Sequence, residues 1–331
     1  MEETAGIQKN SSIAAILICA FLCVFFLNSG LLSMFFLVPF GFALLACNSF
    51  RFTICVTVVL NIAVSVFIRL FIYNKFDLLF TDIIYYTTLL LGFAWIIAGS
   101  KFYNIRTVYR FILASAAGAL VFLFLFFTGM NKSVFSGIFD DLAEKFSLIL
   151  SSPENGAAGH SYLQQMLTPE GIFEIFENVM LHGGALLTVS FFFFINRQLA
   201  ITALWLFKKQ RKDPGLSAFF APPNTIWVLS CSLATIMLSK MFRIEITEIA
   251  AWNVFVVCAI IFLAQGAGIL THILARRTGI FRFATNVLII LMILSPGLNT
   301  IAVAALLLLG VMENWLPFRA VKKGTASTPE P

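Results

Sequence analysis

Charged residues are scarce in this sequence. Only 11% of the 331 residues are Asp, Glu, Lys or Arg, whereas a soluble domain contains about 25%. A water-exposed surface cannot be built from so few charges, so most of the outside of the protein must face lipid. Hydrophobic residues make up 60% of the chain, and 38 residues are Phe. This composition excludes an ordinary soluble protein and indicates an integral membrane protein.

Histidines and paired cysteines are scarce as well. The chain has three His and six Cys, with no CxxC pair and no His at metal-ligand spacing, which argues against a zinc or iron–sulfur site. The motifs HExxH, GxSxG, Walker A and the Rossmann glycine pattern are absent. We therefore expect no catalytic residues, no metal, no cofactor and no enzymatic activity. The net charge of +6 comes from short loops between apolar segments, so we expect no nucleic-acid binding.

Long apolar segments follow one another along the chain. They predict an all-α bundle of eight to ten membrane-spanning helices, because a span needs about 20 residues. The first pair is broken at 28–30 and the last at 295–297, each forming either a hairpin of short spans or one kinked helix. The turn residues favour hairpins. The segments are 13–27, 31–47, 53–72, 78–98, 111–128, 179–207, 225–242, 250–272, 283–295 and 299–315.

The distribution of basic residues predicts the orientation. If the N-terminus is cytoplasmic and the segments alternate, most of the 22 Lys and Arg residues fall on the cytoplasmic side, as the positive-inside rule requires. Both termini are then cytoplasmic, and residues 321–331 form a disordered polar tail. The outer side receives only Lys75, Lys132, Lys145, Lys240 and Arg243.

One long acidic insertion, 129–178, divides the predicted membrane domain of residues 1–320 into an N-terminal block, 1–128, and a C-terminal block, 179–320. Its apolar residues recur at helical spacing, which predicts outer interfacial amphipathic helices at about 133–150 and 161–178. In the second helix, Tyr162, Met166, Ile172 and Phe176 would face inward. The insertion is either a functional element or a spacer that covers the outer face.

Polar side chains at the outer helix ends supply the candidate ligand-binding residues, which are Arg69, Asp82, Glu177 and His182. Ionisable groups within spans are costly and are therefore functional candidates. Arg69 could instead extend outward and pair with a nearby aspartate. His182, with Asn178 four residues before it on the same helix face, could equally mark a hydrated helix end.

Three further polar positions are interpreted as structural. Asn-Arg-Gln at 196–198 would be buried if the sixth span continued to 207, so we expect that span to end near Asn196. Gln265 could donate a hydrogen bond across a close contact made by Ala264 and Gly268. Glu313 is expected to form an ion pair with Arg319, next to Trp315 at the membrane boundary.

Three motifs occur in order in the C-terminal half: Phe-Phe-Ala-Pro-Pro at 219–223, Leu-Ala-Gln-Gly-Ala at 263–267, and Leu-Gly-Val-Met-Glu at 309–313 followed by Phe-Arg at 318–319. Over residues 200–320 they resemble the YybS-like family of uncharacterised bacterial membrane proteins, in which Asp usually stands in place of Glu313. The resemblance implies the bacterial inner membrane. It also implies a distant similarity in fold to the substrate-binding subunits of energy-coupling-factor transporters and to the rod-shape protein MreD.

Two functional hypotheses follow. The first is a small-molecule-binding or transport-related membrane protein, motivated by the outer insertion and the polar outer helix ends. The second is a scaffold for envelope or cell-shape machinery, which would bind other membrane proteins. In both cases the lipid bilayer is the main partner.

Overall fold

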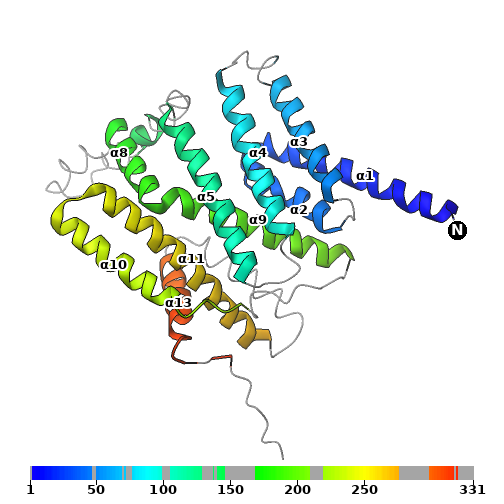
Figure 1. The fold of residues 1–331 in the computed structure, drawn as a ribbon. Coiled ribbons are helices and arrows are strands. Elements are labelled where there is room, and N and C mark those ends of the chain that lie inside the picture. Colours follow the sequence, from blue (N-terminus) through cyan, green and yellow to red (C-terminus); the bar gives the residue numbers. More distant parts are fainter. Residues whose placement is uncertain are drawn as a thin grey trace, which may run out of the picture.

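The computed structural model describes residues 2–46, 50–68, 71, 77–98, 105–128, 137, 140–145, 168–208, 219–275, 298–316 and 318–319. Every regular element in this part of the chain is helical, as the sequence predicts (Figure 1). In chain order the elements are α1 (Glu2–Leu27), η1 (Gly30–Phe35), α2 (Leu37–Ala46), α3 (Phe50–Phe67), α4 (Asp77–Ala98), α5 (Ile105–Phe127), α8 (Pro169–Val179), η3 (Met180–Gly184), α9 (Ala185–Lys208), α10 (Thr225–Phe242), α11 (Glu245–Ala275) and α13 (Leu298–Met312).

Several of these helices are suited to a bilayer. Five described stretches are long and apolar enough to cross a membrane, and four more are shorter apolar helices. Each predicted apolar segment coincides with one of them, except 283–295, which lies outside the described residues. The predicted polytopic helical bundle is therefore confirmed. The long stretches are 79–98, 108–127, 169–204, 225–242 and 245–273, and the shorter ones are 13–27, 32–46, 51–67 and 300–312.

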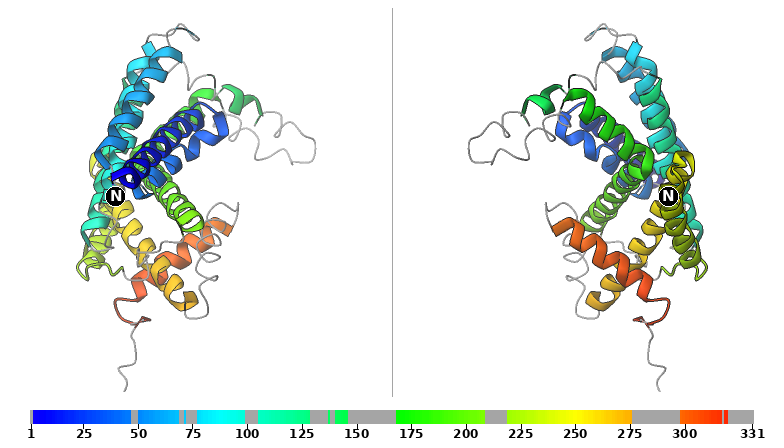
Figure 2. Two further views of the ribbon diagram at one scale, coloured as in Figure 1. Left: turned by 90° about the vertical axis from the view of Figure 1, so that its right-hand side faces the viewer. Right: turned by 90° about the vertical axis from the view of Figure 1, so that its left-hand side faces the viewer.

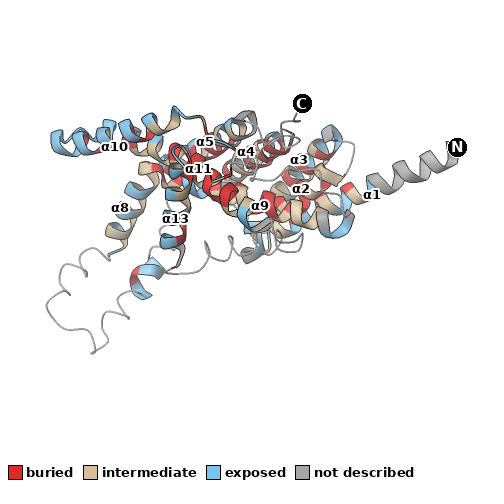
Figure 3. Ribbon diagram, turned by 90° about the horizontal axis from the view of Figure 1, so that it is seen from below, coloured by how far each residue is buried: buried red, intermediate tan, exposed pale blue. Residues whose placement is uncertain are grey.

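The outward faces of the helices carry large apolar side chains. Phe21 and Phe124 are each 65% exposed, and Met237 is 74% exposed. Exposed residues lie along α8 and α10, whereas buried residues gather around α9 and α11 (Figure 3). Water would leave this much apolar surface unfavourably exposed, but lipid tails cover it without cost. The exposed faces therefore agree with a multi-pass membrane protein.

The first pair of apolar segments forms a hairpin. α1 ends at Leu27, where the Asn28 Nδ2 donates to the carbonyl oxygen of Val24 at 2.8 Å. The 3₁₀ helix η1 then turns the chain, and α2 packs back against α1 (Figure 2). The predicted hairpin is confirmed here. The break of the last pair, 295–297, lies outside the described residues.

A kinked helix joins the acidic insertion to the bundle. α8 begins at Pro169, where the Thr168 hydroxyl accepts a hydrogen bond from the Gly171 amide, which is a favourable N-cap. Its apolar face contacts α5 through Phe126, whose ring lies 5.4 Å from that of Phe173. The predicted helix over 161–178 is thus confirmed from Pro169 onward, while Tyr162 and Met166 lie outside the described residues. Of the predicted helix 133–150, the described residues 137 and 140–145 are helical.

The π-helical turn η3 bends the chain between α8 and α9. Gly183 adopts φ 96°, and a Cβ there would lie 2.7 Å from Val256 Cγ2 on α11, so only glycine fits. Asn253 of α11 donates a hydrogen bond of 2.8 Å to the Leu181 carbonyl oxygen inside this turn. The kink is therefore supported from α11, as a break in the helical hydrogen-bond pattern requires.

The expected end of the sixth span near Asn196 is wrong. α9 continues as one helix to Lys208, and Asn196, Arg197 and Gln198 are buried. The neighbouring helices α2 and α5 pack on α9, and Asn196 is bonded to the Met34 carbonyl oxygen of η1. Their burial is a consequence of tertiary packing, which local hydropathy does not report.

Two hydrophobic cores hold the helices together. The larger core joins α1, α2, α4, α5 and α9, with the Phe93 ring 6.4 Å from that of Phe40 and 6.0 Å from that of Phe193. The smaller one is built around Phe219 and Phe262, from the segment before α10 and from α11. We call the helices of the first core, together with α3, the α1–α9 block, and α10, α11 and α13 with residues 219–221 the α10–α13 block. α9, which the sequence assigns to the C-terminal half, thus packs with the N-terminal helices.

Candidate functional site

A cavity of about 240 Å³ lies in the α1–α9 block, between η1, α4 and α9. Hydroxyl groups reach it from each of these elements: Ser33 from η1, Tyr85 and Tyr86 from α4, and Thr188 from α9. Of the described residues that line the cavity, none is charged. The described wall thus combines hydroxyl-bearing residues with apolar ones and carries no charge.

Aromatic rings form much of the wall. Phe36 meets Tyr86 edge-on at 6.0 Å and lies 5.8 Å from Phe192, so three elements contribute to one ring cluster. Tyr85 extends the cluster to Phe122 of α5 at 6.2 Å. These separations are within the range of favourable aromatic pairs, which fixes the rings in position.

Asn196 supports this wall from α9. Its Nδ2 donates hydrogen bonds of 2.9 Å to the carbonyl oxygens of Met34 and Phe192. Both acceptor residues line the cavity. Asn196 is fully buried, and it therefore ties η1 to α9 at the cavity.

Several other buried polar atoms of the α1–α9 block have no hydrogen-bond partner within the described chain. In an apolar interior each such atom costs about 1–3 kcal/mol. They lie on α3, α4, α5 and α9, outside the residues that line the cavity. The atoms are Asn61 Nδ2, Thr87 Oγ1, Ser115 Oγ, Ser190 Oγ and Asn196 Oδ1.

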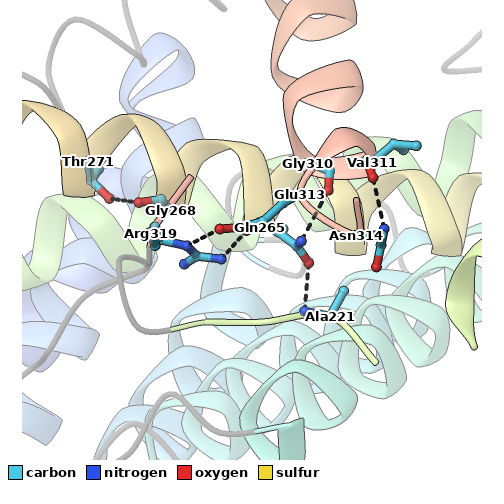
Figure 4. A network of polar contacts seen from close by, with 9 residues as sticks. All are labelled: Ala221, Gln265, Gly268, Thr271, Gly310, Val311, Glu313, Asn314 and Arg319. Atoms are coloured by element: carbon cyan, nitrogen blue, oxygen red, sulfur yellow. Dashed lines mark hydrogen bonds and ion pairs between the residues drawn. The ribbon is translucent and has the colours of Figure 1, made fainter. Parts of the chain in front are cut away.

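Among the described residues, the α10–α13 block has one such atom, His272 Nε2, and a network of paired polar groups (Figure 4). Gln265 accepts a hydrogen bond of 2.7 Å from the Ala221 amide and donates one of 3.1 Å to the Gly310 carbonyl oxygen. Glu313 and Arg319 form a buried ion pair, in which Nε donates to Oε1 at 2.7 Å and Nη2 also contacts Oε2. We call these five residues the Gln265 junction. The predicted hydrogen bond of Gln265 and the predicted ion pair are both confirmed.

The junction depends on a close crossing of α11 and α13. A Cβ at Gly266 would lie 1.9 Å from the Leu306 carbonyl oxygen, and one at Gly310 would lie 2.0 Å from that of Phe262. The backbones therefore touch where the two glycines face each other. The sequence predicted a small-residue contact on this helix but placed it at Ala264 and Gly268. Arg319 completes the packing, since its Cζ lies 3.8 Å from the centre of the Phe220 ring.

The structure places three of the four residues predicted for ligand binding outside the cavity wall. Asp82 lies on α4 one turn before Tyr85, Glu177 lies on α8, and His182 lies in η3; all three are half-buried. The His182 Nδ1 donates to the Asn178 carbonyl oxygen at 2.7 Å, so the expected proximity of these two residues is present. Arg69 lies outside the described residues. Among the described residues, no group of three or more His, Cys, Asp or Glu side chains could hold a metal.

Charged residues do not mark the cavity, because no described residue of its wall is charged. The adjacent Tyr85 and Tyr86 in an apolar helix were a visible signal. Ser33 and Thr188 carried none, since isolated hydroxyl residues are common in spanning helices.

Comparisons with protein-family models, with curated proteins and with solved structures find no match to this chain. The three motifs that resemble the YybS-like family meet in the Gln265 junction, which gives each of them a structural role; the family resemblance itself stays a prediction. The fold and the composition together show a multi-pass integral membrane protein built from helices.

Proposed function

We propose that this membrane protein binds a small molecule in the cavity between η1, α4 and α9, as part of a transport-related role. The observation that carries the proposal is the cavity itself, with its hydroxyl groups and aromatic wall. The cavity measures about 240 Å³ and is partly open, because Met34 and Thr188 in its wall are exposed. A ligand seated there would gain contacts with this wall.

The contrast between the two blocks supports this proposal. In the α10–α13 block, Gln265, Glu313 and Arg319 all have partners within the chain. Among the described residues, five buried polar atoms of the α1–α9 block lack one, against one, His272 Nε2, in the α10–α13 block. A bundle that served only as a scaffold would gain stability from pairing or replacing such atoms. None of these five residues lines the cavity, and water that enters the block could satisfy their polar atoms.

A thermal-shift screen of the full chain in detergent tests the proposal. Compounds are grouped into neutral, anionic, cationic and zwitterionic classes, and a ligand should raise the melting temperature in proportion to its occupancy. Thr188→Phe places a ring in the cavity and should abolish the shift. Ser230→Phe is the matched control, because Ser230 is exposed on α10, away from the cavity.

Two outcomes would contradict the proposal. One is the absence of any ligand-induced shift across all four classes. The other is a shift that survives Thr188→Phe but is lost in His182→Ala or Asp82→Asn, which would move binding to the site predicted from the sequence. If no compound binds and crosslinking instead captures a stoichiometric membrane partner, the scaffold hypothesis replaces this one.

A further inference from the structure

The geometry points to a neutral, planar molecule with two fused aromatic rings as the ligand of the cavity. This inference rests on the proposed function and specifies the chemical class that the cavity accepts. It is argued from the ring arrangement, the absence of charge in the described wall and the volume.

The wall offers aromatic surfaces in fixed orientations. The Tyr86 ring stands nearly perpendicular to that of Phe36, at 81°, whereas Phe192 is tilted by only 33° from Phe36. An aromatic guest can therefore meet one ring by its edge and another by its face. Both arrangements are favourable for aromatic pairs, and a saturated guest of equal size gains neither.

The lack of charge selects against ions. The described residues that line the cavity are aliphatic, aromatic, hydroxyl-bearing or thioether side chains. A charged ligand would lose its hydration there without meeting an opposite charge, which costs several kcal/mol. The hydroxyls of Ser33 and Thr188 can both donate and accept. They suit a ring nitrogen, an N–H or a carbonyl group on a neutral ligand.

The volume sets the size. A dry apolar cavity of about 150 Å³ accepts a single benzene ring. The cavity here measures about 240 Å³, which leaves room for roughly one further fused ring. A single ring would leave part of the wall without contacts, and the third ring of a larger molecule would project through the open side, beyond the wall.

Asn196 acts as a positioning residue for this ligand. It does not line the cavity, but it bonds the backbone of Met34 and Phe192, one on each side. Because Ser33 and Phe36 flank Met34 in the same turn, loss of this tie would release both the hydroxyl and the ring from their places.

Four probes of similar size separate the features of the ligand. They are indole (neutral and planar), indole-3-acetate (anionic), tryptamine (cationic) and 2-decalone (neutral, two saturated rings). The full chain in detergent is titrated with each probe, and binding is read by thermal shift and by ligand-observed NMR. Thr188→Phe reports the background that arises from partitioning of the probes into detergent. Indole should bind at least tenfold more tightly than each of the other three.

Variants at Tyr86 test the role of the ring. Tyr86→Phe keeps the ring and should leave indole affinity within about threefold, whereas Tyr86→Leu should weaken it by roughly 2- to 10-fold, the worth of one aromatic pair. Tyr109→Leu is the control for removing a tyrosine ring, because Tyr109 is exposed on α5 and does not line the cavity. Asn196→Leu should weaken indole binding. Ser190→Ala is its control, because Ser190 is also a buried polar residue of α9, and this variant should bind indole as the wild type does.

Several results would overturn the inference. If indole-3-acetate or tryptamine binds more tightly than indole, the ligand is charged; if 2-decalone binds equally well, aromaticity is irrelevant. If no probe binds above the Thr188→Phe background, the two-ring assignment is rejected. The proposed function survives these results if the four-class screen yields another ligand whose shift Thr188→Phe removes, and it falls with the inference if the screen yields none. Should Tyr86→Leu fail to fold, the probe ranking and Tyr86→Phe still decide.

Discussion

The crossing of α11 and α13 supports one stability prediction in detail, at Gly266. A Cβ added there would lie 1.9 Å from the Leu306 carbonyl oxygen, whereas close carbon–oxygen contacts are normally about 3.3–3.6 Å. Gly266→Ala must therefore move the two helices apart by about 1 Å or more. Overpacking of this kind costs about 1–3 kcal/mol. The Gln265–Gly310 hydrogen bond, already 3.1 Å, spans the same interface, and its loss adds about 1 kcal/mol.

Gly266→Ala should therefore lower the free energy of unfolding by about 2–4 kcal/mol in total. Helix propensity alone would have the opposite effect, since alanine favours a helix over glycine by about 1 kcal/mol. The sign of the effect is therefore informative. Gly137→Ala is the matched control, because no atom lies within 4 Å of the added Cβ, and it should be neutral or slightly stabilising. Unfolding by sodium dodecyl sulfate in mixed micelles, followed by circular dichroism, measures both variants.

A double mutant checks the mechanism. Gly310→Ala alone should cost about as much as Gly266→Ala, because its Cβ would lie 2.0 Å from the Phe262 carbonyl oxygen. Once the first alanine has separated the helices, the second Cβ makes fewer close contacts. The double mutant should therefore lose clearly less stability than the sum of the losses in the two single mutants. A Gly266→Ala variant as stable as Gly137→Ala would refute the reasoning, and so would strict additivity.

The remaining predictions concern buried polar groups and the kink. Gln265→Leu leaves two backbone groups unpaired and should cost about 2–4 kcal/mol, measured by the same unfolding assay; a change below 0.5 kcal/mol, roughly the level of a surface substitution, would contradict it. Arg319→Met leaves the buried Glu313 carboxylate uncompensated and should cost about 3–5 kcal/mol, whereas the pair Arg319→Met with Glu313→Leu should recover most of that loss. Gly183→Ala should destabilise by about 1–3 kcal/mol because of its positive φ, and limited proteolysis should cut α8 faster in this variant than in wild type.

Much of the fold could be predicted because hydropathy and turn residues act locally. The expected segments 78–98 and 225–242 agree with α4, Asp77–Ala98, and α10, Thr225–Phe242. The course of α9 could not be predicted in this way, since the burial of Arg197 depends on α2 and α5. Hydropathy penalises a charge in a span, but only the neighbouring helices decide whether that charge is covered.

The candidate site was not predicted from the sequence, for a related reason. The predicted residues Asp82, Glu177 and His182 do not line the cavity. Ionisable residues attract attention because their burial is costly. A neutral cavity is formed by residues that are unremarkable individually, and Asn196 and its acceptor Met34 are 162 positions apart. Such a site becomes visible only when the helices are assembled.

The Gln265 junction also constrains the order in which the protein can be assembled. Gln265 and its acceptor Gly310 are 45 positions apart, and the Glu313–Arg319 pair comes later still in synthesis. When α10 and α11 enter the bilayer, the amide nitrogen of Gln265 has no acceptor on α13, and the Phe220 ring has no cation above it. The helix pair must wait in this incomplete state until α13 arrives beside it. A chain that ended before α13 would therefore leave the Gln265 amide without its Gly310 acceptor.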